Sequence, residues 1–188
     1  LDLLLLLNKE EIINWKGKFR APIQNQTIYP RPDRKLPVWI AVGGTPSSIE
    51  RAGRLGLPII FAIIGGKPSQ FKPLVEYYKQ VYRYYGHPEE KMQIGIHSHT
   101  FVTNNEEKLF TDYFPHYAAQ MDRIGKSRGW QPYTKAQFQA GMSEEGALFM
   151  GDIEKVKEKK TELIETFGIT RFVAHVDVGA PPHDEIMR

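Results

Sequence analysis

Two glycine-containing segments of the sequence have the residue types that bind anions. GGTPSS (43–48) follows the apolar run PVWIAV, and the pair Gly65–Gly66 follows PIIFAII. Where such a segment opens a helix, unpaired N–H groups and the helix dipole favour a phosphate. A tight turn with a capping threonine is the alternative interpretation. The residues that we expect to bind an anionic ligand are Gly43, Gly44, Thr45, Ser48, Gly65 and Gly66.

Histidines form the second candidate group. His97 and His99 alternate with Ser98 in an apolar run, so on a strand they would point to one face. There they could bind a ligand or hold a proton near neutral pH, or simply form a polar lining. His175 and Asp177 alternate in the same way. Because no third ligand is apparent near the histidine pair, we expect no metal site.

Several classes of protein are excluded or disfavoured. The 188 residues contain no cysteine, which excludes thiolate chemistry and disulfides. Neither a Gly-x-Ser-x-Gly elbow nor an HExxH motif is present, and GGTPSS is neither a P-loop nor a GxGxxG fingerprint. The net charge is only +3, with bases and acids interleaved, so we expect no nucleic-acid partner. The opening LDLLLLL is too short to span a bilayer, and we expect a cytoplasmic protein.

Apolar runs and helical periodicity alternate along the chain. An almost wholly apolar run such as 58–64 is typical of a strand buried on both faces of a parallel sheet. Thr45–Pro46 would begin one helix, Gly86 would end another, and Asp152 and Gly168 would bound a third. The predicted strands are Pro37–Val42, Pro58–Ile64, Met92–Val102 and Arg171–Val178.

The alternation predicts parallel strands joined by right-handed crossovers, in either a doubly wound sheet or part of a (β/α)8 barrel. Residues 104–150 form a long, aromatic-rich helical insertion that is broken by Pro115. An insertion of this length after a strand more often covers a site than merely connects elements. In both architectures ligands bind at the carboxyl ends of the strands, where the two glycine pairs lie.

Four segments together resemble the luciferase-like flavin-dependent monooxygenase family. The strand with GGTP and the AIIGG segment are the most specific parts of this resemblance, which extends over nearly the whole chain. The segments are WKGKFRAPIQNQTIYPRP (15–32), LPVWIAVGGTPSSIERAGRLGLPIIFAIIGG (36–66), DRIGKSRGW (122–130) and GALFMGDIEKVKEKK (146–160).

The resemblance implies a (β/α)8 TIM barrel, of which residues 1–188 form the carboxyl-terminal half as a single domain. Its strands five to eight would be present, with residues 104–150 inserted after strand seven. A complete barrel takes about 250 residues, so we expect a fragment or a truncated chain. By position, the loop at 43–48 corresponds to the flavin phosphate site, and His97 and His99 would line the pocket.

The implied function is that of a flavin-dependent oxidoreductase or monooxygenase that uses reduced FMN and dioxygen on a small organic substrate. In this family the cofactor carries the chemistry, while the protein orients the reactants and excludes water. One alternative is a reductase or dehydrogenase that uses F420, and another is a non-catalytic half-barrel for binding or assembly. We also expect a homodimer, with a flavin reductase as a possible partner.

Overall fold

The computed structural model describes residues 1–187, and the chain divides into two compact units, residues 1–38 and 39–188. The first unit consists of helix α1 (Asp2–Lys9) and an antiparallel hairpin of β1 (Ile12–Trp15) and β2 (Ile23–Thr27). The side-chain amide of Asn8 donates from Nδ2 to the carbonyl of Leu36 and accepts at Oδ1 from the amide of Leu36, at 2.8 Å each, which ties the end of this unit to its helix.

The second unit is built on a sheet in which every strand pair is parallel. Its order is β3-β4-β5-β6, and β7 pairs with the long central strand β5. The strands are β3 (Ile40–Val42), β4 (Ile59–Ala62), β5 (Ile94–Val102), β6 (Phe149–Gly151) and β7 (Arg171–His175).

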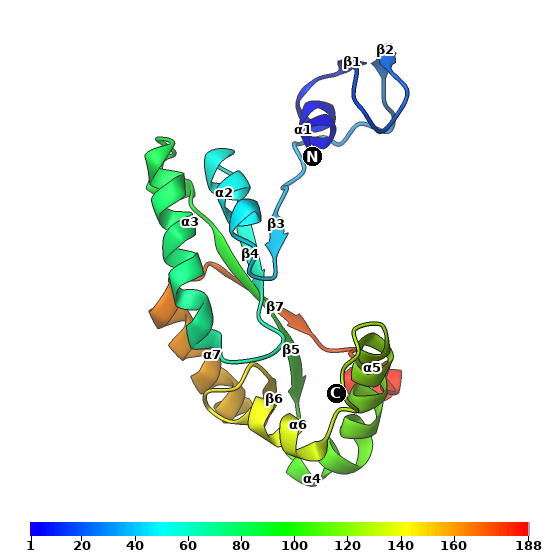
Figure 1. The fold of residues 1–188 in the computed structure, drawn as a ribbon, viewed down its shortest axis with the longest axis vertical. Helices are drawn as coiled ribbons and strands as arrows, with labels where there is room; N and C mark the ends of the chain where they lie inside the picture. The colour runs from blue at the N-terminus through cyan, green and yellow to red at the C-terminus, as the bar shows by residue number, and fades with distance from the viewer. Residues whose placement is uncertain (188) are drawn as a thin grey trace. The chain divides into compact units, whose positions relative to one another are not determined.

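Three helices, α2, α3 and α7, lie on one side of this sheet (Figure 1). Alternate residues of β4 and β5, among them Phe61 and Ile96, pack against them in the main hydrophobic core. Asp152 begins α7 by accepting a hydrogen bond from the amide of Lys155 at 2.9 Å, and Gly168 ends it with φ 67°. The helices are α2 (Pro46–Arg54), α3 (Lys72–Tyr84, after the 3₁₀ turn η1 at Pro68–Phe71) and α7 (Ile153–Phe167).

The insertion forms a second hydrophobic core, which is rich in aromatic side chains. In it Tyr113 stacks on Phe101 of β5 at a centroid distance of 4.3 Å, and Phe138 contacts both Tyr113 and Tyr117. Its elements are α4 (Glu106–Lys108), the π-helical segment η3 (Leu109–Tyr113), α5 (Phe114–Lys126) and α6 (Lys135–Met142). The remaining short helices are η2 (Glu89–Lys91) and α8 (His183–Ile186).

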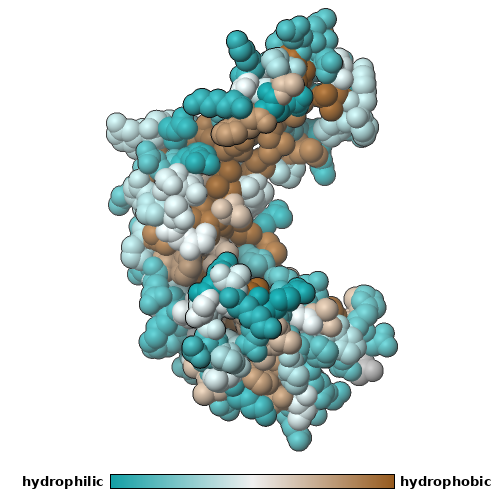
Figure 2. All heavy atoms as spheres, turned by 45° about the vertical axis from the view of Figure 1, so that its right-hand side comes forward, coloured by the Kyte–Doolittle hydropathy of each residue, from teal (hydrophilic) through white to brown (hydrophobic). Residues whose placement is uncertain are grey.

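Within the described residues of the second unit, no helix layer covers the opposite face of the sheet as α2, α3 and α7 cover the first. Ile60 and Val173 on this face stay half-buried, and Ile64, just beyond β4, is 44% exposed. Figure 2 shows apolar residues exposed at the surface rather than fully enclosed. Such a face is the inner surface that a closed barrel would bury.

The predicted strands and helices are confirmed, with shorter strands than the sequence suggested. The strand β6 was not predicted, because three residues at the end of the insertion carry no detectable alternation. The sequence predicted that Pro115 would break the helical stretch. Instead the chain stays helical here, and Pro115 lies in the first turn of α5, directly after the π-helical segment. The change from π-helical to α-helical hydrogen bonding falls at this proline, whose ring excludes the regular bond to the carbonyl four residues earlier.

A buried lysine joins the end of the insertion to helix α7. The ammonium group of Lys159 donates to the carbonyl oxygens of Ser143 and Leu148, both at 2.7 Å, and lies 5.2 Å from the ring centre of Phe149. Burial lowers the pKa of Lys159 to about 8. The cost of burying the charge is thus offset by two charge-assisted hydrogen bonds.

We therefore expect Lys159→Met to destabilise the protein by about 1–3 kcal/mol, because it leaves the carbonyl of Leu148 without a donor. Urea unfolding at pH 7 measures this. The matched control is Lys157→Met, which removes an exposed ion pair with Glu154 on the same helix; it should change stability by less than about 0.5 kcal/mol. Equal stability of the two variants would show that the buried bonds contribute nothing net.

Candidate functional site at the carboxyl ends of the strands

The predicted site residues meet at one edge of the sheet because the strands are in register. Val42 and Ile96 lie in one row of paired residues that crosses the sheet. Gly43 and His97 follow this row by one residue each and so lie one level nearer the carboxyl edge of the sheet. Gly65 lies slightly further along, in the loop after β4. The row of paired residues that crosses four strands is Val42, Phe61, Ile96 and Phe172.

The loop after β3 presents backbone and a hydroxyl group that the fold does not use. Gly44 has φ +116°, a conformation that side-chain-bearing residues rarely adopt, and a Cβ at Gly43 would meet nothing within 4 Å. Thr45 is the exposed N-cap of α2, yet its side chain makes no capping hydrogen bond within residues 1–187. The amide of Ser48 donates to the Thr45 carbonyl at 3.1 Å. The loop therefore leaves backbone and a hydroxyl group accessible at the start of α2.

The loop after β4 has the same open character. A Cβ on Gly65 would also meet nothing within 4 Å, and Gly66 adopts φ +73°. Because β3 and β4 are neighbouring parallel strands, this loop lies beside the first one at the same edge of the sheet. The two predicted loops are thus adjacent, as one shared anionic ligand would require.

Three histidines come together on the face opposite the helices. His97 and His99 of β5 have ring centres 5.2 and 5.3 Å from that of His175, which pairs with His99 in the sheet register. Nε2 of His175 lies 3.0 Å from Oδ1 of Asp177, whereas its buried Nδ1 has no hydrogen-bond partner among the described residues. Within residues 1–187 no group of three potential ligands has metal-binding geometry.

Burial sets the protonation state of this cluster. It lowers the pKa of His97, and it lowers that of His99 to about 4, with repulsion from His175 as the next cause in both. Nδ1 of His99 shares a hydrogen bond of 2.9 Å with the hydroxyl of Tyr117 in α5. His99 is therefore neutral near pH 7, and its position is fixed by the insertion.

A cavity of about 860 Å³ lies between the loop after β4 and the insertion. Ile64, Gly65 and Gly66 form one wall, and side chains of α5 and α6 form the others. Tyr117, which bonds His99, belongs to this lining. The cavity therefore reaches from the glycine loop to Tyr117, the hydrogen-bond partner of His99, while the histidines themselves are not part of its lining.

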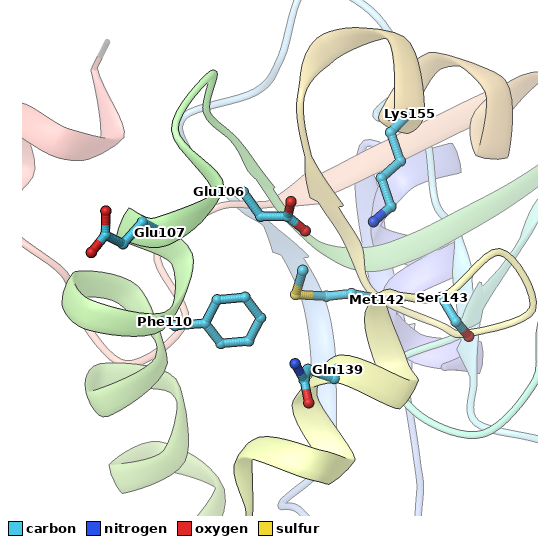
Figure 3. A pocket seen from close by; sticks show the side chains of 7 residues that line it. All are labelled: Glu106, Glu107, Phe110, Gln139, Met142, Ser143 and Lys155. Carbon is cyan, nitrogen blue, oxygen red and sulfur yellow. The ribbon is translucent and has the colours of Figure 1, made fainter.

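A second hollow of about 500 Å³ lies between α4, α6 and the first turn of α7. In Figure 3 Glu106, Met142 and Lys155 point into it, while Glu107 points away. It contains none of the predicted site residues, so we do not connect it with the candidate site.

The sequence did not single out His175 and Tyr117 as members of the cluster. The alternation of His175 with Asp177 was a detectable signal, but only the pairing of β7 with β5 shows that it faces His99. Tyr117 is one of many aromatic residues in the insertion, so its residue type alone does not mark it as the partner of His99. His87, by contrast, lies away from this edge, and its Nε2 contacts the carbonyl of Arg54 at the end of α2 at 3.0 Å.

Solved structures show how this fold relates to known proteins. The monooxygenase RslO1 from Streptomyces bottropensis matches 96% of this chain at 17% identity, with a TM-score of 0.68. An F420-dependent secondary alcohol dehydrogenase matches 98% at 17% identity and a TM-score of 0.65. The oxygenating constituent of 3,6-diketocamphane monooxygenase from Pseudomonas putida, in complex with FMN, matches 98% at 16% identity and a TM-score of 0.54. No curated protein matches the sequence.

The sequence profile of the luciferase-like monooxygenase family matches residues 1–171. The chain therefore belongs to the luciferase-like monooxygenase family, and its fold is part of a (β/α)8 barrel. It spans 53% to 58% of the length of the three structures just named. No helix in the described part of the chain is both long and apolar enough to cross a membrane.

The lowered pKa of His99 leads to a prediction about pH. Between pH 6.5 and about 4 the unfolded chain binds a proton at this residue and the folded chain does not, so stability should fall as the pH falls through this window. In His99→Gln the decline should be shallower, because proton uptake by unfolded His99 is lost, while the groups that face the position, His97, His175 and Tyr117, remain. Urea unfolding of both proteins across this range, with an NMR titration of His99, measures it. A His99 midpoint near 6.5 would contradict it.

Proposed function

We propose that the chain is part of a flavin-dependent oxidoreductase that uses reduced FMN and dioxygen to oxidise a small organic substrate. Membership of the luciferase-like monooxygenase family supports the class of reaction. The observation that carries the cofactor proposal is the loop at 43–48, with open backbone at Gly43 and an unengaged hydroxyl on Thr45 at a helix N-terminus. When bound, the cofactor would supply the redox chemistry.

The residues of this chain have holding and shielding roles in the proposal. Gly43, Gly44, Thr45 and Ser48 would bind the phosphate, and Gly65 and Gly66 would allow the cofactor to approach the second loop. His97 and His99 would face the reacting groups from the floor of the site. The aromatic core of the insertion would keep water away from them.

F420 is the second candidate cofactor. Two structures with the same fold are named F420-dependent, a secondary alcohol dehydrogenase and the tetrahydromethanopterin reductase from Methanopyrus kandleri. F420 has a longer anionic tail, for which Lys67 is a candidate contact, although this lysine already forms an ion pair with Glu145. A single lysine gives little support for the longer tail, so FMN is the first choice. A homodimer, a flavin reductase partner and a cytoplasmic location remain predictions.

The phosphate assignment predicts that Thr45→Val weakens FMN binding by about 1–2 kcal/mol, the loss of one hydrogen bond to a charged group. Because Thr45 makes no capping bond within the described residues, the substitution should leave α2 intact. Fluorescence titration of the protein with FMN and with riboflavin, which lacks the phosphate, measures the effect. Only FMN binding should change, and the control Thr166→Val on exposed α7 should change neither. Equal losses for both flavins would reject the phosphate contact.

Titration of the same protein with F420 distinguishes the two cofactors. Tighter binding of F420 than of FMN, with sensitivity to Lys67→Ala, would favour the second candidate.

A further inference from the structure

The hollow of about 500 Å³ between α4, α6 and the first turn of α7 lies apart from the candidate site and combines apolar with charged surface. Met142 and Phe110 supply apolar surface; the first is almost fully buried and the second half-buried. The polar groups come from three different helices, with Glu106 on α4, Gln139 on α6 and Lys155 on α7 (Figure 3). Three elements distant in sequence thus converge on one small space.

The two charged groups that enter this hollow have opposite signs and no partners. Glu106 and Lys155 both point into it, whereas the neighbouring Glu107 points away (Figure 3). Within residues 1–187 neither the carboxylate of Glu106 nor the ammonium group of Lys155 forms an ion pair or a hydrogen bond, with each other or with another residue. A ligand in the hollow would therefore meet one free anion and one free cation.

The surroundings of Lys155 hold its stem in place and favour an anion beside its charge. A Cβ on Gly151 would lie 2.9 Å from Cδ of Lys155, and Gly151 has φ +139°, so glycine leaves room for the lysine stem. Lys155 and Lys159 are one turn apart on α7, and their repulsion is, after burial, the next cause of the lowered pKa of Lys159. A carboxylate next to Lys155 would offset this repulsion.

The remaining lining suits a small organic group. The side-chain amide of Gln139 makes no hydrogen bond within the described residues, so it is free both to donate and to accept. Phe110 offers an aromatic ring and Met142 a polarisable thioether, and both contact aromatic side chains favourably. A ligand that carries an ammonium group, a carboxylate and an apolar side chain would engage every part of this lining.

We propose that this hollow binds a small zwitterion with an apolar side chain, such as a free aromatic amino acid. Its carboxylate would lie at Lys155, its ammonium group at Glu106, and its side chain against Phe110 and Met142. Because the hollow is open to solvent, each charge contributes modestly, and we expect a Kd of about 1 mM.

Three ligands of nearly the same shape test the ligand class. L-Phenylalanine carries both charges at neutral pH, N-acetyl-L-phenylalanine lacks the ammonium group, and L-phenylalaninamide lacks the carboxylate. Each is titrated into the protein and followed by NMR at the backbone amides of Phe110 and Met142 and at the side-chain amide of Gln139. We expect each analogue to bind at least about threefold more weakly than L-phenylalanine. Equal binding of the three, or no saturable shift at these groups, would overturn the proposal.

Two substitutions test where each charge binds. Lys155→Met should weaken binding of L-phenylalanine at least about threefold and leave that of the amide unchanged, because the amide has no carboxylate to lose. Glu106→Gln should likewise weaken binding of L-phenylalanine and leave that of the N-acetyl analogue unchanged. The matched controls are Lys157→Met, on the same helix and exposed, and Glu107→Gln, whose side chain points away. Equal losses in the controls would show a general effect of net charge and would reject the site.

This proposal and the proposed function fail separately, since the hollow shares no residue with the loops at 43–48 and 65–66. The comparison of the three ligands uses the unaltered protein, so it does not depend on whether a variant folds. FMN binding by a protein that does not bind L-phenylalanine would reject the zwitterion site alone. Binding of L-phenylalanine by a protein that binds neither FMN nor F420 would reject the proposed function alone.

Discussion

The arrangement of the site depends on the register of four parallel strands. Because Val42, Phe61, Ile96 and Phe172 form one row, every residue that follows them reaches the same edge at nearly the same level. Parallel pairing requires each connection to cross over one face, which leaves the other face for side chains such as those of His97 and His99. A shift of one residue in β5 would turn these side chains towards the helices. The candidate site is therefore a consequence of strand register more than of any single contact within it.

The insertion determines the chemistry of that edge. Its aromatic core packs on the end of β5, and Tyr117 reaches from it to the buried His99. An imidazole buried without a partner would be costly, so the hydrogen bond to Tyr117 is what makes the position tolerable. The same burial keeps His99 uncharged near neutral pH. The insertion thus supplies the low-dielectric surroundings of the histidines and one wall of the cavity together.

Sequence reasoning located the elements whose signals are local. Helices α2 and α7 follow from an N-cap before an amphipathic repeat, and Gly168 marks the end of α7. Strand β6 escaped prediction because it exists only through pairing with the last residues of β5. The hairpin near the start was also missed, since the strand IQNQT is polar and lacks alternation. For the site, residue type identified the loops at 43–48 and 65–66, but the partner of His99 and the cavity depend on contacts distant in sequence.

Two regions of opposite character therefore lie side by side at the carboxyl edge. The loop after β3 leaves backbone and a hydroxyl group uncommitted, so it favours a ligand that accepts hydrogen bonds and carries negative charge. The cavity beyond the loop after β4 is lined by apolar side chains of the insertion, such as Met121 and Ile124, and by the exposed ion pair of Lys67 and Glu145. The loop at 65–66 belongs to both regions, and its glycines remove the side chains that would otherwise separate them. In the proposed function, an anionic cofactor would occupy the loop after β3 and lie against the loop at 65–66, where the cavity begins.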